Sequence, residues 1–280
     1  MSEPIVATSR ALRDLGGHVL LVGAGKMGGA LLDGWLALGL DPSKLAVLEP
    51  HPSPEIAAQA IGGLRLNPDP AAVPAAAIVL AIKPQIAPEV LPALAGLSSR
   101  AVVISIMAGR TLGFLERMLG AETHAVRAMP NTPAAIGRGI TVAVANAQVS
   151  AAQRDLADTL LAATGSVEWV RDEGLLDAVT AVSGSGPAYV FLLAESLARA
   201  GVAAGLPPEL AARLARETVA GAGELLHRSP LDPRTLREKV TSPAGTTAAA
   251  LDVLMGADGL DDLMTRAVAA ATRRSRELAG

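Results

Sequence analysis

Short aliphatic runs alternate with amphipathic stretches over the first part of the chain. The runs HVLLVGAG, KLAVLEP, AAIVLAIKP and AVVISIMAG are almost wholly apolar and stop at Gly or Pro, and a helical stretch, MGGALLDGWLALG, follows the first run. Strands without polar alternation are typical of a parallel sheet covered on both faces. HAVRAMP, GITVAVAN and VEWV are further predicted strands, and Ser150 to Gly165 forms a predicted helix. The pattern predicts a doubly wound, mostly parallel α/β sheet.

Strand signals end after about Arg171, and the rest of the chain is helical in pattern. A long apolar segment from Glu173 to Leu206 precedes helical stretches at 209–228, 246–256 and 260–278. We therefore expect an α/β domain at 1–170 and an all-α domain at 171–280. Within the long segment, SGSGPAY (Ser183 to Tyr189) breaks the pattern. Its small residues permit the close approach of a flat ring or backbone, or tight helix–helix packing.

Composition restricts the function classes. The 280 residues are 50% hydrophobic and only 18% charged, with a net charge of -3 and no cysteine. A surface short of charge suggests that another subunit covers part of it; the alternative is that the high alanine content alone accounts for the low charge. No basic run points to nucleic acid, no apolar run reaches membrane-spanning length, and no secretory signal is present. The four histidines form no chelating pair. We expect a cytoplasmic protein without a metal site, a nucleic-acid partner or a membrane partner.

Gly23, Gly25 and Gly28 form a G-x-G-x-x-G between the first predicted strand and the first helix. In a dinucleotide site the first glycine makes the turn and the second admits the pyrophosphate. The third lets helix and strand pack closely, and the helix N-terminus supplies N–H donors. The position predicts a Rossmann-like nicotinamide-binding domain; the alternative is a tight structural turn.

Three further strand ends carry candidate cofactor residues. Glu49 follows the glycine loop by about 20 residues, where a carboxylate bonds the ribose hydroxyls and repels a 2′-phosphate. Lys83 and Ala108 stand at the ends of the next runs and should border the nicotinamide. Both Glu49 and Lys83 could instead be ordinary solvated side chains. The turn MPNTP, Met129 to Pro133, is either part of the site or only a rigid corner.

The stretch VTSPAGTTAAAL, Val240 to Leu251, places a hydroxyl-rich turn at the start of a helix. Pro243 and Gly245 force a turn, and Thr246 with Thr247 opens the helix, so that N–H groups and hydroxyls converge on a small anion such as a carboxylate. A simple N-cap by Ser or Thr is the alternative, but it accounts for one hydroxyl only.

The ordered set GAGKMGGAL, AIKP, MPNTP, SGSGPAY and TSPAGTT closely resembles the pyrroline-5-carboxylate reductase family from about Val19 to the C-terminus. The resemblance implies NAD(P)H-dependent reduction of 1-pyrroline-5-carboxylate to L-proline, with NADPH or NADH as cofactor. It also implies an all-α dimerisation domain, a substrate site near the dimer interface, and a homodimer or higher homo-oligomer.

The resemblance also assigns site residues. Ser242, Gly245, Thr246 and Thr247 match the loop that holds the substrate carboxylate and ring nitrogen, with Thr247 placed on the nitrogen. Ala244 stands where the family commonly has Gly, which puts the fine geometry of that loop in question. The residues matching the cofactor site are Gly23, Ala24, Gly25, Lys26, Met27, Gly28, Glu49, Asn67, Ile82, Lys83 and Ala108.

Two other functions remain open. A reductase of another small carboxylate, such as a β-hydroxyacid dehydrogenase, needs a catalytic Lys on the long interdomain helix, where this chain has none. A non-catalytic nicotinamide-binding sensor could dispense with the SPAGTT loop.

Overall fold

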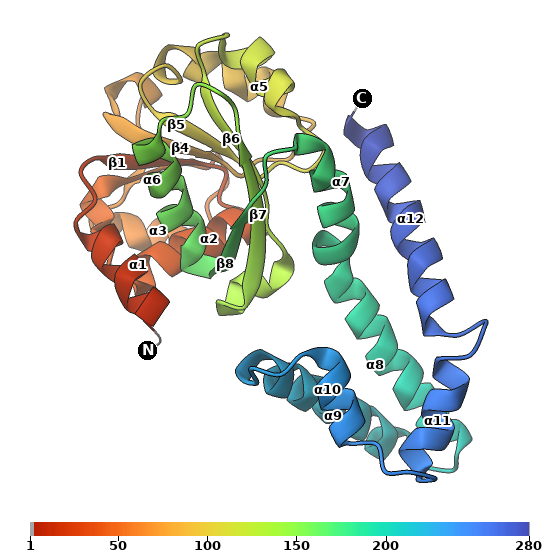
Figure 1. Cartoon of the computed structure of the whole chain (residues 1–280). Helices are drawn as coiled ribbons and strands as arrows, with labels where there is room; N and C mark the ends of the chain where they lie inside the picture. The colour runs from red at the N-terminus through yellow and green to blue at the C-terminus, as the bar shows by residue number, and fades with distance from the viewer. Residues whose placement is uncertain (1–2, 280) are drawn as a thin grey trace. The chain divides into compact units, whose positions relative to one another are not determined.

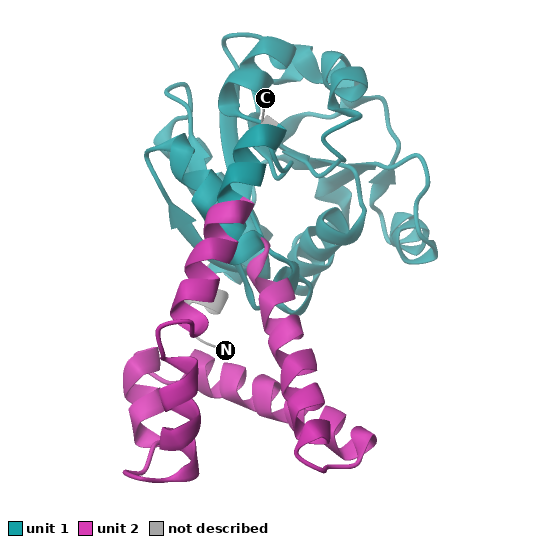
Figure 2. Ribbon diagram, turned by 90° about the vertical axis from the view of Figure 1, so that its right-hand side faces the viewer, with its two compact units in different colours: residues 1–184, 272–280 teal, residues 185–271 magenta. Residues whose placement is uncertain are grey.

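The computed structural model describes residues 3–279, and contacts divide the chain into two compact units (Figures 1 and 2). Unit 1 comprises residues 1–184 and 272–280, and unit 2 comprises residues 185–271. The domain boundary predicted after residue 170 is the point where strands give way to helices in the sequence, and it stays a prediction. The contacts instead join residues 171–184 to the sheet.

Unit 1 is built on an eight-stranded sheet with the order β3-β2-β1-β4-β5-β6-β7-β8. Neighbouring strands are parallel except β6 and β7, which are antiparallel. The strands are β1 (His18–Val22), β2 (Leu45–Leu48), β3 (Arg65–Leu66), β4 (Ala75–Leu80), β5 (Val102–Ser105), β6 (His124–Met129), β7 (Gly139–Ala145) and β8 (Gly165–Trp169). The strand order reverses between β1 and β4, which confirms the predicted doubly wound fold.

The sheet separates two hydrophobic cores, which explains its unbroken apolar strands. Leu21 and Val79 point into one core beside Trp35, whose Nε1 donates to the Leu160 carbonyl at 2.8 Å. Leu20 and Leu80 point into the other core. The helices of unit 1 are α1 (Glu3–Arg13), α2 (Lys26–Ala37), α3 (Pro54–Ile61), α4 (Ala87–Val90), α5 (Leu112–Leu119), α6 (Ala151–Leu161) and α7 (Leu176–Val179). The sequence pattern missed α1, which packs through the fully buried Leu12.

Residues 171–184 are tied to the sheet by a partly buried ion pair and by close packing. Glu173 Oε1 accepts hydrogen bonds from Arg127 Nη1 at 2.9 Å and from the Leu112 N–H at 2.8 Å. A Cβ added at Gly184 would lie 2.7 Å from Met129 Cε. The predicted break at SGSGPAY is only partial, because a π-helical turn, Thr180–Gly184, leads almost directly into the next helix.

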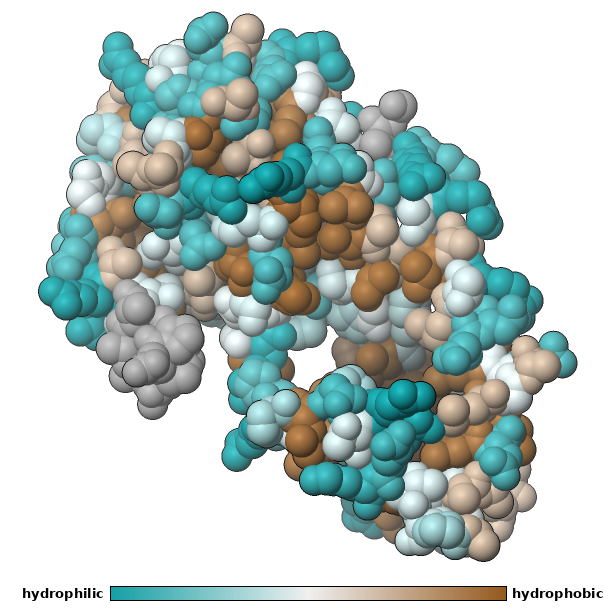
Figure 3. Space-filling model, in the orientation of Figure 1, coloured by the Kyte–Doolittle hydropathy of each residue, from teal (hydrophilic) through white to brown (hydrophobic). Residues whose placement is uncertain are grey.

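Unit 2 is helical throughout its regular structure, as predicted. Its elements are α8 (Gly186–Ala203), α9 (Pro208–Arg228), α10 (Pro233–Lys239), α11 (Thr246–Leu254) and the first part of α12 (Leu260–Ala279). Many of its large apolar side chains are exposed, including Phe191 at 65% and Val253 at 76%, and Figure 3 shows apolar residues at its surface. α8 buries none of its residues within the chain. The continuous helical stretch Glu173–Ala203 is also long and apolar enough to cross a membrane by length and composition, with a mean hydropathy of 1.3 over an 18-residue window.

Candidate cofactor and substrate sites

The glycine loop joins β1 to α2 with its backbone packed against β4. A Cβ at Gly23, where φ is +89°, would lie 2.8 Å from the Ala81 carbonyl oxygen. A Cβ at Gly28 would lie 2.2 Å from the Gly23 carbonyl oxygen, which is far inside contact distance. Neither position can carry a side chain, because each one places two backbone segments in direct contact.

Gly25 differs from the other two glycines, because a Cβ there would meet nothing within 4 Å. Gly25 is the N-cap of α2 and supplies no side-chain cap to the first turn of the helix. The space above Gly25 and the N–H groups of that turn suit a pyrophosphate. Lys26 is exposed and lines a hollow together with Gly25, and Met27 is half-buried. These residues fit a dinucleotide.

Glu49 stands at the carboxyl end of β2 and reaches the glycine loop. Its Oε2 accepts a hydrogen bond from the Ala24 N–H at 2.9 Å, and its Oε1 accepts one from the His51 N–H at 3.1 Å. Asn67 holds the Glu49 backbone from both sides, since its Oδ1 accepts the Glu49 N–H at 2.8 Å and its Nδ2 donates to the Glu49 carbonyl at 2.9 Å. Asn67 has a left-handed φ of +50°. The sequence singled out both residues but not this pairing.

A hollow of about 280 Å³ borders the glycine loop on the side of α3. Ser53 and Glu55, neither of which the sequence analysis named, line it together with Gly25 and Lys26. The Ser53 hydroxyl is the largest cause that lowers the pKa of Glu55 from its usual value, followed by the Glu55 backbone N–H. Glu55 is therefore ionised at neutral pH, and the loop from Glu49 to Glu55 carries carboxylates and no Lys or Arg.

The ends of β4 and β5 lie side by side, because the Ile106 N–H donates to the Leu80 carbonyl at 3.0 Å. Lys83 and Ala108 are exposed just beyond these ends, and Ile82 is half-buried. The structure thus brings Lys83 and Ala108, which were predicted to border the nicotinamide, and the predicted cofactor residue Ile82 to the same edge of the sheet as the glycine loop. No motif in the sequence singles out Arg110, whose guanidinium donates to the Pro84 carbonyl in this region.

The MPNTP turn is held to β7 by the side chain of Asn131. Asn131 Oδ1 accepts a hydrogen bond from the Ile140 N–H at 3.0 Å, and a 3-10 helix, Thr132–Ile136, follows directly. These contacts favour the rigid-corner interpretation of Asn131.

In unit 2 the SPAGTT loop makes a tight turn before α11. The Gly245 N–H donates to the Ser242 carbonyl at 3.0 Å, and Ala244 between them has a left-handed φ of +56°. That is the geometry of a turn in which Gly is preferred at the third position. The turn therefore persists despite the Ala244 methyl group. Gly245 is the N-cap of α11, so no hydroxyl caps the helix from that position, and Ser242, Thr246 and Thr247 are exposed. The first turn of α11 and these hydroxyls suit a carboxylate.

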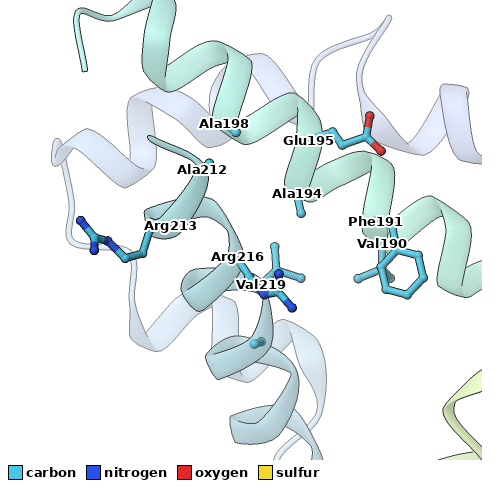
Figure 4. A pocket seen from close by; sticks show the side chains of 10 residues that line it. Val190, Phe191, Ala194, Glu195, Ala198, Ala212, Arg213, Arg216 and Val219 are labelled. Carbon is cyan, nitrogen blue, oxygen red and sulfur yellow. The ribbon is translucent and has the colours of Figure 1, made fainter. Parts of the chain in front are cut away.

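Another hollow, of about 760 Å³, lies in unit 2 between α8 and α9 (Figure 4). Its walls are mostly aliphatic, with Phe191 at one end and Glu195, Arg213 and Arg216 as its charged side chains. Such walls favour apolar packing rather than chemistry.

Family models match both parts of the chain. Residues 173–278 match a model described as pyrroline-5-carboxylate reductase dimerisation. Residues 18–109 match one described as NADP oxidoreductase coenzyme F420-dependent.

Pyrroline-5-carboxylate reductase from Pseudomonas aeruginosa is 42% identical to the chain over 266 residues, which cover 94% of this chain and 97% of the relative. The chain belongs to the pyrroline-5-carboxylate reductase family. This membership confirms the resemblance seen in the motifs and makes the protein an oxidoreductase that carries the family's dimerisation domain.

Solved structures of the pyrroline-5-carboxylate reductase family have the same fold. The Coxiella burnetii structure is 34% identical with a TM-score of 0.88, and it is matched over 95% of this chain and 100% of its own. The Plasmodium falciparum structure, which has NADP bound, is 30% identical with a TM-score of 0.79, over 95% of this chain and 99% of its own.

The glycine loop generates a prediction that separates packing from ligand binding. Gly28→Ala should destabilise the protein by about 1–3 kcal/mol, because its Cβ is forced against the Gly23 carbonyl oxygen. Gly25→Ala should leave the free energy of unfolding nearly unchanged, yet weaken dinucleotide binding at least tenfold, because its methyl group fills the space left for the pyrophosphate. Urea unfolding and cofactor titration measure the two effects. Equal losses of stability in both variants would contradict this division.

Proposed function

We propose that the protein reduces 1-pyrroline-5-carboxylate to L-proline with NADPH or NADH, the last step of proline biosynthesis. Full-length similarity to the family carries the proposal. The separate loops for a dinucleotide and for a small carboxylate, built on the residues named above, support it.

The chemistry needs little from acidic or basic side chains. A cyclic imine protonated at nitrogen has an electrophilic carbon, and a bound reduced nicotinamide supplies the hydride. The residues of the chain then position the reactants. The first turn of α11, with Ser242, Gly245 and Thr246, binds the substrate carboxylate, and the Thr247 hydroxyl hydrogen-bonds the ring nitrogen. Glu49 and Asn67 hold the adenosine side of the cofactor, while Ile82, Lys83 and Ala108 line its nicotinamide side.

The uncovered apolar faces of unit 2 support a homodimer or a higher homo-oligomer. The hollow between α8 and α9 lies within the stretch that matches the dimerisation model, so a second copy of the chain is its proposed occupant. We attribute the apolar length of Glu173–Ala203 to the same subunit packing rather than to a membrane. The proposed setting is the cytoplasm, without a nucleic-acid partner.

The activity is tested directly by adding 1-pyrroline-5-carboxylate to the protein and a reduced nicotinamide cofactor. The expected result is a fall in cofactor absorbance with formation of proline. Flat absorbance with this substrate and oxidation of cofactor by a keto acid would favour a reductase of a different carboxylate. Cofactor binding without any turnover would favour the sensor.

The carboxylates around the adenosine side predict that NADH is used at least as well as NADPH. Glu49 accepts the Ala24 N–H, and it follows the glycine loop at the spacing of a ribose-binding carboxylate, so it should repel a 2′-phosphate. Glu49→Ser should shift the ratio of kcat/KM values toward NADPH by about tenfold, equivalent to about 1.4 kcal/mol. Glu55→Gln is the matched control, with a smaller shift expected. An unchanged ratio in Glu49→Ser would show that the carboxylate does not face the 2′ position.

The hydroxyl of Thr247 should matter for turnover and not for cofactor binding. Thr247→Ala removes one hydrogen bond to the reacting ring, worth about 0.5–1.5 kcal/mol, and more if it strengthens as hydride transfers. We expect kcat/KM for the imino acid to fall by at least several-fold at an unchanged cofactor Kd. Thr265→Ala is the control, because its exposed hydroxyl bonds the Asp261 carbonyl of its own helix. Full activity of Thr247→Ala would remove the role assigned to this residue.

A further inference from the structure

The C-terminal end of α12 belongs to unit 1, as the colouring of Figure 2 shows. Ser275 Oγ donates to Asp177 Oδ1 at 2.7 Å, and Arg276 Nε lies 3.8 Å from Asp177 Oδ2. Ser275 is 7% exposed, and the Asp177 side chain is 16% exposed. A hydrogen bond to a carboxylate with little water around it is strong, so it holds this helix end firmly against α7.

One turn later, the helix backbone touches the turn after β5. A Cβ added at Gly109 would lie 3.0 Å from the Leu278 carbonyl oxygen and 3.3 Å from its carbon. Gly109 also has a left-handed φ of +70°. Only glycine satisfies both conditions, because any side chain is strained by the backbone angle and meets the helix end. Gly109 directly follows Ala108, a proposed cofactor-lining residue.

The same turn is fastened to the loop after β4. Arg110 donates to the Pro84 carbonyl through Nε at 3.2 Å and Nη2 at 2.8 Å. Its guanidinium lies 4.5 Å from the centre of the Phe114 ring, which fixes its orientation. A chain of contacts thus runs from Leu278 through Gly109 and Arg110 to Pro84, next to Lys83.

We propose that the last turns of α12 brace the nicotinamide side of the cofactor site. The hydrogen bond between Ser275 and Asp177 holds this helix end in place. The Leu278 carbonyl lies against the turn at Gly109, and Arg110 joins that turn to the loop that carries Lys83. These are positioning residues, since none of them touches the reacting atoms. The inference rests on the proposed function only for the identity of the dinucleotide.

The first test is a chain that ends at Glu277, which lacks the Leu278 carbonyl but keeps the Ser275 anchor. We expect the Kd and KM for the reduced cofactor to rise at least threefold, while the KM for the imino acid and the Tm change little. Ser275→Ala should act in the same direction. Arg274→Ala is the matched control, because Arg274 lies on the same turns but pairs with the exposed Glu277 rather than with Asp177. A role in stability alone would instead lower the Tm without this separation of the KM values.

The second test uses glycines with similar backbone angles. Gly109→Ala and Gly137→Ala carry the same kind of strain, since φ is +70° and +67°, but only the first methyl group meets another segment. Gly109→Ala should therefore raise the cofactor Kd well above that of Gly137→Ala. When both substitutions are made in the chain that ends at Glu277, most of this difference in cofactor Kd between them should disappear.

Cofactor fluorescence gives the Kd without turnover, so the proposed function and the proposed brace can be contradicted independently. Unchanged cofactor Kd in both the shortened chain and Ser275→Ala overturns the brace, even if proline is formed. If the full-length protein binds the cofactor but does not reduce 1-pyrroline-5-carboxylate, the proposed function is wrong. The cofactor Kd of the shortened chain and of Ser275→Ala still tests the brace. A protein that binds no reduced nicotinamide dinucleotide overturns both.

Discussion

Backbone contact at the carboxyl ends of β1 and β4 fixes the position of the candidate cofactor site. Gly23 lies against the Ala81 carbonyl and Gly28 against the Gly23 carbonyl, so strand, turn and helix meet without intervening side chains. Because α2 starts at this contact, its first N–H groups are directed to the edge where β4 and β5 also end. A Cβ at Gly25, between these two contacts, would meet nothing within 4 Å, and Lys83 and Ala108 follow the strands that end at the same edge of the sheet.

Unit 2 lacks such close internal packing, because many of its large apolar side chains find too few partners within one chain. α8 has no buried residue and α9 buries only Ala211 and Ala215. Exposed aliphatic surface of this extent is costly in water and marks an interaction surface. The family's dimerisation domain covers residues 173–278, which include these exposed apolar side chains, so the proposed subunit packing also accounts for the low charge of the sequence.

Backbone strain gathers in the two loops proposed to hold ligands. Asn67 and Ala244 are the non-glycine residues with positive φ in the described part of the chain. Asn67 offsets its strain with the reciprocal hydrogen bonds to Glu49, whereas the methyl group of Ala244 gains no such compensation from its own side chain. Such strain persists only where the surroundings demand the conformation. The SPAGTT turn therefore keeps its shape because of the residues around Ala244, not because of Ala244 itself.

The sequence by itself determined the features that depend on neighbouring residues. Apolar runs bounded by Gly and Pro located every strand except the two-residue β3 (Arg65–Leu66). The spacing of Gly23, Gly25 and Gly28 located the candidate dinucleotide loop, and Pro243 with Gly245 located the turn before α11. Only the tertiary structure decided the contacts between residues far apart in the chain, such as Glu49 with Ala24, Glu173 with Arg127 and Leu278 with Gly109. Helix α1 escaped the sequence pattern for the same reason, since its place depends on the core that buries Leu12. Periodicity and turn chemistry act over a few residues, whereas which distant groups meet is set by the packing of the whole sheet and its helices.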